Sequence, residues 1–131
     1  MVLHEEKLFE AFAISTKRQH YVDLLATKRG RDKIRLGLDH FDDLDPRSCK
    51  RVPASEQSPS GVLKILQSLG APSQCHLMSS RSDLDRREMD LSEALPEVIG
   101  GGMGTFVSCV PGKLAYFEGE APKRRFICRR K

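Results

Sequence analysis

Two histidine and aspartate pairs have the spacing of metal ligands. His20 and Asp23 stand three residues apart, and so do His40 and Asp43. Positions i and i+3 of a helix share a face, so each pair could present one nitrogen and one oxygen ligand, and two antiparallel helices could bring both pairs to one ion. However, Asp43 falls in a turn, and no glutamate or third histidine on another segment completes a site. We therefore expect surface or packing roles for these side chains, and no metal or other cofactor.

A second candidate is a polar ligand site between two segments that are far apart in the sequence. The loop at 79–88 follows a predicted strand and precedes a predicted helix, a position that often holds ligands in mixed α and β folds. A hairpin is predicted at 105–120, and the alternation of a strand turns Glu118 and Glu120 to the same side. The sequence gives this carboxylate pair no histidine or arginine partner for acid and base catalysis. The candidate ligand residues are Ser79, Ser80, Arg81, Asp83 and Glu118.

The alternative for the 79–88 loop is a solvated segment tied by internal ion pairs, each of which contributes little to stability. The sequence identifies no catalytic residue, and whether the protein is an enzyme stays open.

Positive charge is concentrated in two parts of the chain. The net charge is +4, with a sequence pI near 9.0. Residues 17–35 hold seven basic side chains against two acidic ones, and the last nine residues hold six more basic ones. Such segregation is typical of a protein with a polyanionic partner when the charges also converge in space. The predicted anion-binding residues are Lys28, Arg29, Arg31, Lys33, Arg35, Arg124 and Arg125.

The partner predicted from these charges is nucleic acid or an acidic protein. Aromatic residues make up 6% of the chain, tryptophan is absent, and no RRM, KH or zinc-finger pattern occurs, which favours backbone contact with a duplex over base stacking. The alternative is a solvated helix face on which Asp32, Asp39 and the glutamates at 5–10 neutralise the basic residues.

The four cysteines are far apart and form no C-x-x-C pair, so we expect buried free thiols rather than a zinc site. Cys75 and His76 are neighbours, but neighbours on a strand point to opposite faces, which argues against a nucleophile and its base. No stretch has the roughly 18 apolar residues of a membrane span, and the N-terminus lacks the order of a signal peptide. We expect a cytoplasmic protein with no membrane partner.

The glycine-rich segment at 100–104 connects a predicted helix at 90–99 to the predicted hairpin. A phosphate-binding loop needs its glycines after a strand and before a helix, and here the order is reversed. The segment therefore predicts a helix C-cap and a tight entry into strands at 105–110 and 114–118. A further strand is expected at 125–129.

The remaining periodicity predicts helices at 4–14, 16–28 and 31–41, with Gly30 ending the second, and a short edge strand at 48–52. Alternatively, Gly30 lies within one long helix, at a cost of about 1 kcal/mol relative to alanine. A helix capped by Ser58 or Ser60 then runs to Leu69, and a strand follows at 74–79.

These elements give an α+β fold in which an N-terminal helical section packs against a small, mainly antiparallel sheet ending in a three-stranded meander. We expect a single domain over 1–131, helical to about residue 45 and mixed from about 46 to 131. Its predicted role is a small basic binding module; the alternative is a small enzyme or ligand-binding protein with the polar site at 79–88 and 105–120. An exposed strand edge could also support a homodimer.

Overall fold

The computed structural model describes residues 3–120 and 124–130, and within them six strands form one antiparallel sheet. The strands lie side by side in the order β1-β6-β5-β4-β2-β3. Their bounds are β1 Cys49–Arg51, β2 Gln74–Ser79, β3 Glu88–Asp90, β4 Thr105–Val110, β5 Leu114–Glu118 and β6 Arg125–Arg129. The strands β4, β5 and β6 are neighbours both in the chain and in the sheet, so the predicted α+β fold with a terminal meander is confirmed.

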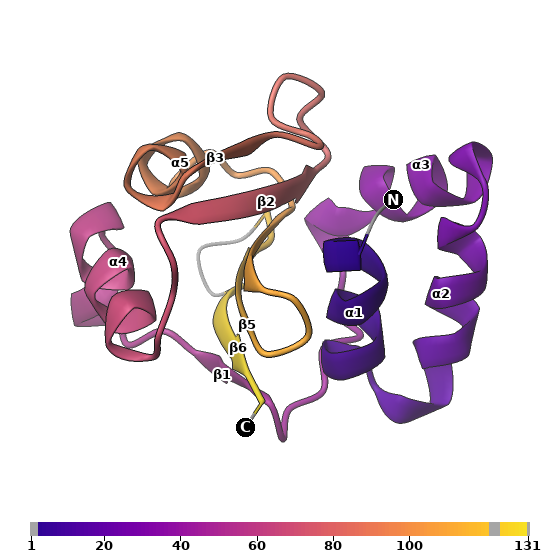
Figure 1. Cartoon of the computed structure of the whole chain (residues 1–131), viewed down its shortest axis with the longest axis horizontal. Coiled ribbons are helices and arrows are strands. Elements are labelled where there is room, and N and C mark those ends of the chain that lie inside the picture. The colour runs from indigo at the N-terminus through magenta and orange to yellow at the C-terminus, as the bar shows by residue number, and fades with distance from the viewer. Residues whose placement is uncertain (1–2, 121–123, 131) are drawn as a thin grey trace.

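Helices cover both faces of the sheet (Figure 1). On one side lie α1 (Leu3–Phe12), α2 (Arg18–Leu25) and α3 (Lys28–Leu36), and on the other lie α4 (Pro59–Ser68) and α5 (Leu91–Val98). Short 3-10 turns connect them at Ser15–Lys17 (η1), Leu38–His40 (η2) and Ala54–Glu56 (η3). The molecule therefore has three layers and two apolar cores, one on each face of the sheet.

The two cores follow from the alternation of strand side chains. Phe106 and Phe117 face the layer of α1 to α3, where they pack with Phe9 and Phe41. Val107 and Tyr116 face α4 and α5 in the second core. Because both faces are covered, β4 and β5 read as nearly continuous apolar runs.

Several predicted element boundaries are confirmed. Strands occur at 74–79, 105–110, 114–118 and 125–129, and β1 is an edge strand. The Ser58 hydroxyl accepts a hydrogen bond from the Gly61 amide at the start of α4, and Asp90 accepts one from Ser92 at the start of α5. Ser58 is one of the two caps predicted for its helix, and Asp90 is of a residue type that favours this position.

Two elements differ from the sequence prediction. The second helix ends at Leu25, and Gly30 lies in the first turn of α3, where the Thr27 hydroxyl caps it. A Cβ at Gly30 would overlap the Leu24 carbonyl, so this glycine permits the close approach of α2 and α3. The sequence also predicts no strand at 88–90, because the three residues of β3 are too few to show alternation.

The glycine segment forms the predicted link from helix to strand. Gly100 and Gly102 have φ of +86° and +71°, which only glycine adopts readily. Gly104 donates its amide hydrogen to Asp39, and a Cβ there would overlap the Leu38 carbonyl. The segment therefore ties the start of β4 to η2, in the layer of α1 to α3.

Among the helices of the described residues, none combines the length and the apolar character that crossing a membrane requires.

Candidate functional site

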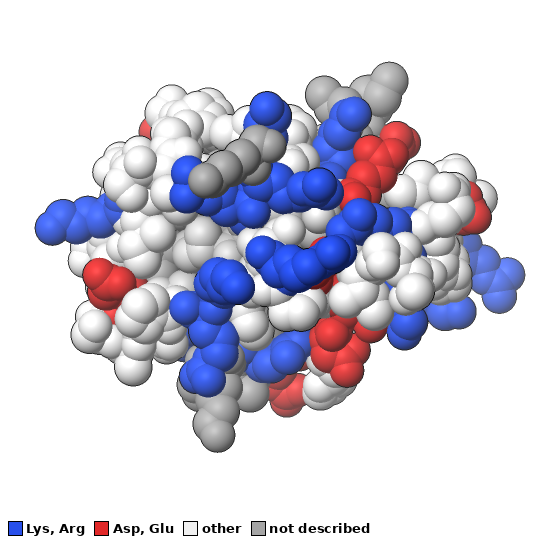
Figure 2. All heavy atoms as spheres, turned by 90° about the horizontal axis from the view of Figure 1, so that it is seen from below, with Lys and Arg blue, Asp and Glu red and all other residues white. Residues whose placement is uncertain are grey.

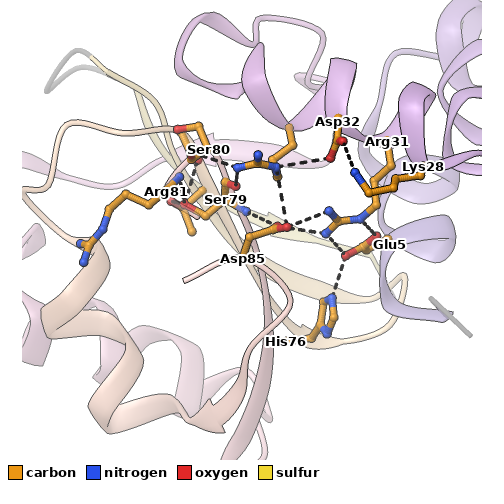
Figure 3. Close-up of polar contacts among 12 residues, drawn as sticks. Glu5, Lys28, Arg31, Asp32, His76, Ser79, Ser80, Arg81 and Asp85 are labelled. Carbon is orange, nitrogen blue, oxygen red and sulfur yellow. Dashed lines mark hydrogen bonds and ion pairs between the residues drawn. The ribbon is translucent and has the colours of Figure 1, made fainter. Parts of the chain in front are cut away.

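Arg31, at the centre of the predicted basic cluster, lies inside the protein. Its guanidinium donates to both carboxylate oxygens of Glu5 at 2.7 Å and to those of Asp85 at 2.7 and 2.9 Å (Figure 3). The Arg31 side chain is 3% exposed and that of Glu5 is fully buried. Arg31 therefore joins α1, α3 and the loop before β3, and its charge is matched internally.

The other basic residues of α3 differ in their contacts: some bond to protein groups and others are exposed to solvent. Arg35 donates to the carbonyl oxygens of Ser79 and Ser80 at 3.2 and 3.1 Å. Lys28 pairs with Asp32 at 3.0 Å on the surface, while Arg29 and Lys33 are exposed. Anion binding on α3 stays a prediction for Lys28, Arg29 and Lys33.

Arg124, just before β6, and Arg125, its first residue, contact different layers of the molecule. Arg124 donates to the Phe41 carbonyl and lies over the Phe126 ring. Arg125 donates to the Gln57 side chain and lies 3.4 Å from Glu118. These contacts hold both guanidiniums, so the seven predicted residues do not form one exposed basic surface.

The polar loop at 79–88 is held in place by hydrogen bonds and an ion pair with other residues of the protein. The Ser79 hydroxyl lies 2.7 Å from that of Thr105, and the Ser80 hydroxyl donates to Asp39. Arg81 pairs with Asp83 at 2.6 Å and donates to the Glu97 carbonyl (Figure 3 shows Ser79, Ser80 and Arg81). Of these contacts, only the Arg81–Asp83 pair lies within the loop, and the others tie the loop to β4, η2 and α5.

Glu118, the fifth predicted ligand residue, is buried below the glycine segment. It accepts hydrogen bonds from the Tyr116 hydroxyl at 2.8 Å and the Gly100 amide at 3.0 Å. Burial and the charge of Glu118 raise the pKa of Tyr116. Glu120 is instead exposed and pairs with His40 at 3.1 Å, so the two glutamates do not act as a carboxylate pair.

The candidate metal ligands have other partners. Asp23 accepts a hydrogen bond from Gln19, and Asp43 accepts one from Tyr21. His20 and His40 both line a pocket of about 240 Å³ between α2 and η2. Over residues 3–120 and 124–130, no group of three or more histidine, cysteine, aspartate and glutamate side chains is placed to hold an ion.

A histidine cluster not singled out in the sequence joins α1 to the sheet. The rings of His4 and His76 stack with centroids 5.3 Å apart. His76 lies 2.8 Å from Glu5 and 2.6 Å from Glu88, and His4 lies 2.7 Å from the Ser108 hydroxyl. Ser108 is only 2% exposed, so this serine–histidine contact lies within the packed interface of α1 and the sheet.

A groove of about 500 Å³ opens beside the edge strand β1, where the second helical layer stops short of the sheet edge. Its apolar wall comes from three elements: Val52 follows β1, Ile127 lies on β6, and Ile65 and Leu69 lie on α4 and directly after it. The space is large enough for one or two apolar side chains of a partner.

Basic side chains surround this apolar wall. Arg47, Lys50, Arg51 and Arg129 line the groove and are exposed, against a single lining carboxylate, Glu56. Asp45 pairs with Arg47 at 3.2 Å, whereas Arg51 and Arg129 form no ion pair with any described residue. Figure 2, which views the molecule from the side where β1 lies, shows lysine and arginine side chains gathered across this face. We call these eight residues, four apolar and four basic, the β1 groove.

The outer edge of β1 adds free backbone groups to the β1 groove. Bonds from the Val52 amide to the Arg125 carbonyl, and from the Arg129 amide to the Ser48 carbonyl, fix the phase of the β1–β6 ladder. In an antiparallel ladder the intervening residues point their amide and carbonyl groups away from the partner strand. The backbone of Arg51 therefore faces outward, available to a further strand.

The β1 groove is missed in the sequence because its charges come from distant segments. Arg47, Lys50 and Arg51 form no long basic run, and Arg129 is brought beside them only by the register that pairs Lys50 with Ile127. Both strands are predicted, but their pairing is not. A prediction that the strand at 48–52 pairs with the strand at 125–129 would have placed these basic residues together.

The lining of the β1 groove contains guanidiniums, an ammonium, aliphatic side chains, one serine hydroxyl and the Glu56 carboxylate, but no histidine or cysteine among the described residues. Comparisons of the chain with protein-family models, curated proteins and solved structures gave no match, so its function is inferred from these residues.

Proposed function

We propose that this protein is a non-catalytic binding module that receives an extended acidic segment of a partner protein in the β1 groove. The observation that carries the proposal is an apolar wall beside an open strand edge, with the exposed Lys50 and Arg129 on the same face of the sheet as Ile127 and with Arg47 and Arg51 at the edge. An extended peptide can add a strand to such an edge, with backbone bonds supplying affinity and alternate side chains supplying specificity.

The composition of the groove favours a peptide over nucleic acid. No aromatic side chain lines it, whereas single-stranded nucleic acid is usually held by stacking on aromatic rings. The aliphatic wall of Ile65, Leu69 and Ile127 instead matches an apolar side chain of a peptide. Burying one leucine there contributes about 2 kcal/mol, more than a single exposed ion pair at about 0.5 kcal/mol. The wall therefore supplies affinity, and the cations select for acidic neighbours.

Binding is tested with a fluorescent peptide in which one leucine is flanked by glutamates, and with a matched peptide in which lysines replace the glutamates. Fluorescence polarisation with the full chain measures the affinity at low and high salt. We expect saturable binding of the acidic peptide that weakens with salt, because the rim charges are exposed and screened. The lysine peptide should not bind.

The matched control uses the basic residues of α3. The double variant Lys50→Glu, Arg129→Glu, which reverses the two cations on the face of Ile127, should weaken acidic-peptide binding roughly tenfold or more. The variant Arg29→Glu, Lys33→Glu makes the same change in net charge away from the groove and should stay within roughly twofold of the parent. Equal losses in both variants would mean that net charge, not the groove, governs binding.

Other partners are outcomes of the same experiment. Salt titrations with generic duplex DNA and RNA are run beside the peptides, since polyanion binding is strongly salt-dependent. Tight duplex binding without peptide binding would replace the proposal with a nucleic-acid module. If light scattering shows a dimer, and the variant Lys50→Glu, Arg129→Glu is a monomer, the groove is assigned to a second copy of the chain.

A further inference from the structure

Two of the four buried cysteines face each other across the edge of the sheet. The register of β1 and β6 places Cys49 directly opposite Cys128. Both side chains point into the core under α1 to α3, and they are 5% and 0% exposed. The two residues lie far apart in the sequence, so only the sheet brings them together.

The hydrogen-bond phase makes this an unusually close pair. The bonded positions of β1 are Ser48 and Val52, which bracket Cys49 and Arg51 in the alternation. Cys49 and Cys128 therefore occupy a position without direct backbone bonds, where Cα atoms of antiparallel strands come to about 4.5 Å. That separation lies within the range that a disulfide spans, about 4.4–6.8 Å. Burial and contact with the Cys49 thiol both raise the pKa of Cys128, which agrees with adjacent thiols.

The other two cysteines provide an internal comparison. Cys75 on β2 and Cys109 on β4 lie one position beyond the paired residues His76 and Ser108, and both point into the core under α4 and α5. They are also neighbours, since burial and the Cys75 thiol both raise the pKa of Cys109, but Cys109 is at a bulge in β4. Their thiols turn to different backbone oxygens: Cys75 to the Met89 carbonyl at 3.4 Å and Cys109 to that of Val107 at 3.9 Å. These two strands are also interior strands of the sheet, whereas β1 has a single neighbour.

We propose that Cys49 and Cys128 are a redox modification site that closes to a cross-strand disulfide on exposure to a low-molecular-weight disulfide, while Cys75 and Cys109 stay as thiols. One protein thiol loses its proton and attacks the small disulfide, which releases one small thiol and leaves a mixed disulfide. The second protein thiol, also deprotonated, then attacks the mixed disulfide and releases the second small thiol. Two protein thiols are oxidised, and one small disulfide is reduced to two thiols.

Access to the pair comes from the edge strand. β1 has three residues and bonds only to β6, so it opens at a lower free energy than strands paired on both sides. Cys75 and Cys109 lie on β2 and β4, which are each paired on both sides, so reaching their thiols requires opening the interior of the sheet. The bond would fix β1 to β6, and the inference does not depend on what the β1 groove binds.

The experiment incubates the reduced, folded chain with oxidised glutathione, quenches it in acid, and alkylates the remaining thiols after denaturation. Intact mass should show two alkylated cysteines, and peptide mapping should join Cys49 to Cys128. The bond closes a loop of about 80 residues, so the melting temperature should rise by roughly 10 °C and return on reduction.

Three double alanine variants separate position from reactivity. The variant Cys75→Ala, Cys109→Ala keeps the proposed pair and should form an internal disulfide. Cys49→Ala, Cys128→Ala keeps the other two thiols, and Cys49→Ala, Cys109→Ala keeps Cys75 with Cys128; neither should form one. Far-UV circular dichroism establishes that each variant is folded before oxidation. The proposal is overturned if the folded parent keeps all four thiols after incubation with oxidised glutathione, or if all three variants oxidise alike.

Discussion

At the scale of single residues, Glu5 is the point where most buried charge converges. It accepts two hydrogen bonds from Arg31 and lies 2.8 Å from His76, with no exposed surface. Burial alone would raise the pKa of Glu5, but the bonds from Arg31 and His76 outweigh it and lower the pKa to about 2. A carboxylate this deep persists because each of its oxygens has a cationic partner.

This pKa predicts a loss of stability in acid. A depressed folded-state pKa means that Glu5 stabilises the protein above its unfolded value of 4.5 and loses that contribution as pH falls towards about 2. The free energy of unfolding should drop by roughly 3 kcal/mol from this group across that window. Urea midpoints measured between pH 7 and pH 2 test the prediction.

Glu5→Gln should be less stable than the parent by roughly 3–5 kcal/mol at pH 7, because it leaves Arg31 charged and buried with only Asp85. Its acid-side slope should also be shallower. Glu88→Gln is the matched control, since Glu88 bonds the same histidine with a side chain that is 63% exposed. An unchanged acid slope in Glu5→Gln would contradict the assignment.

His76 titrates in the opposite sense. Burial would lower its pKa, but the bonds to Glu5 and Glu88 outweigh it and raise the pKa. The stabilisation from charged His76 is therefore complete below its unfolded value of 6.5 and is lost as pH rises through the raised folded value. Glu5 and His76 together therefore stabilise the packing of α1 on the sheet most between the unfolded pKa values of 4.5 and 6.5.

At the scale of elements, the glycine segment is a contact surface as well as a turn. Gly104 is buried against η2, and a side chain there has no space beside the Leu38 carbonyl. The segment thus connects the layer of α4 and α5, which it leaves at Val98, to the opposite layer.

Gly104→Ala should therefore lower the free energy of unfolding by roughly 2–3 kcal/mol, because the backbone of η2 must move to admit the methyl group. Gly37→Ala is the control: its φ is −92° and the nearest atom to an added Cβ is 3.4 Å away. Chemical denaturation of both variants gives the comparison. Equal costs would show that backbone entropy, rather than the contact with η2, explains the effect.

Local signals explain which elements could be predicted. The strands at 105–110 and 114–118 combine alternating or apolar side chains with a turn at Pro111 and Gly112, and helix starts at Ser58 and Asp90 carry their own caps. By contrast, β3 and the boundary between α2 and α3 depend on tertiary contacts. β3 exists because it pairs with β2, and Gly30 is needed because Leu24 lies against it.

The candidate site was harder to predict because register is not local. The density of positive charge along the chain predicts anion binding by Arg31 and Arg35. However, the guanidinium of Arg31 donates to the Glu5 carboxylate and that of Arg35 to the Ser79 carbonyl. The β1 groove gathers Arg51 and Arg129 only through the pairing of two strands separated by most of the chain. Counting charges in sequence windows does not reveal which charges a fold neutralises.

At the scale of the whole molecule, two apolar cores share one sheet. The residues of β4 and β5 alternate between the cores, so disturbing either face moves the same strands. We therefore expect the cores to unfold together, as one cooperative domain.

The two tyrosines test this directly, because each belongs to a different core. Tyr21 packs against the core under α1 to α3, and Tyr116 lies in the core under α4 and α5. In the variant Tyr21→Phe the tyrosine fluorescence reports Tyr116 alone, and in Tyr116→Phe it reports Tyr21 alone. Within each variant, the fluorescence and far-UV transitions should coincide in urea. A separation between them would divide the chain into two independently unfolding parts.

The position of β6 between β1 and β5 also sets an order in time. During synthesis on the ribosome, β1 emerges early but has no partner until residues 125–129 follow, since β6 is its only neighbour among the described strands. In a nascent chain, β2, β4 and β5 can pair with one another before β1 has a partner strand. The surface proposed to bind a partner is thus the last part of the sheet to be completed, and an interrupted translation product would lack it.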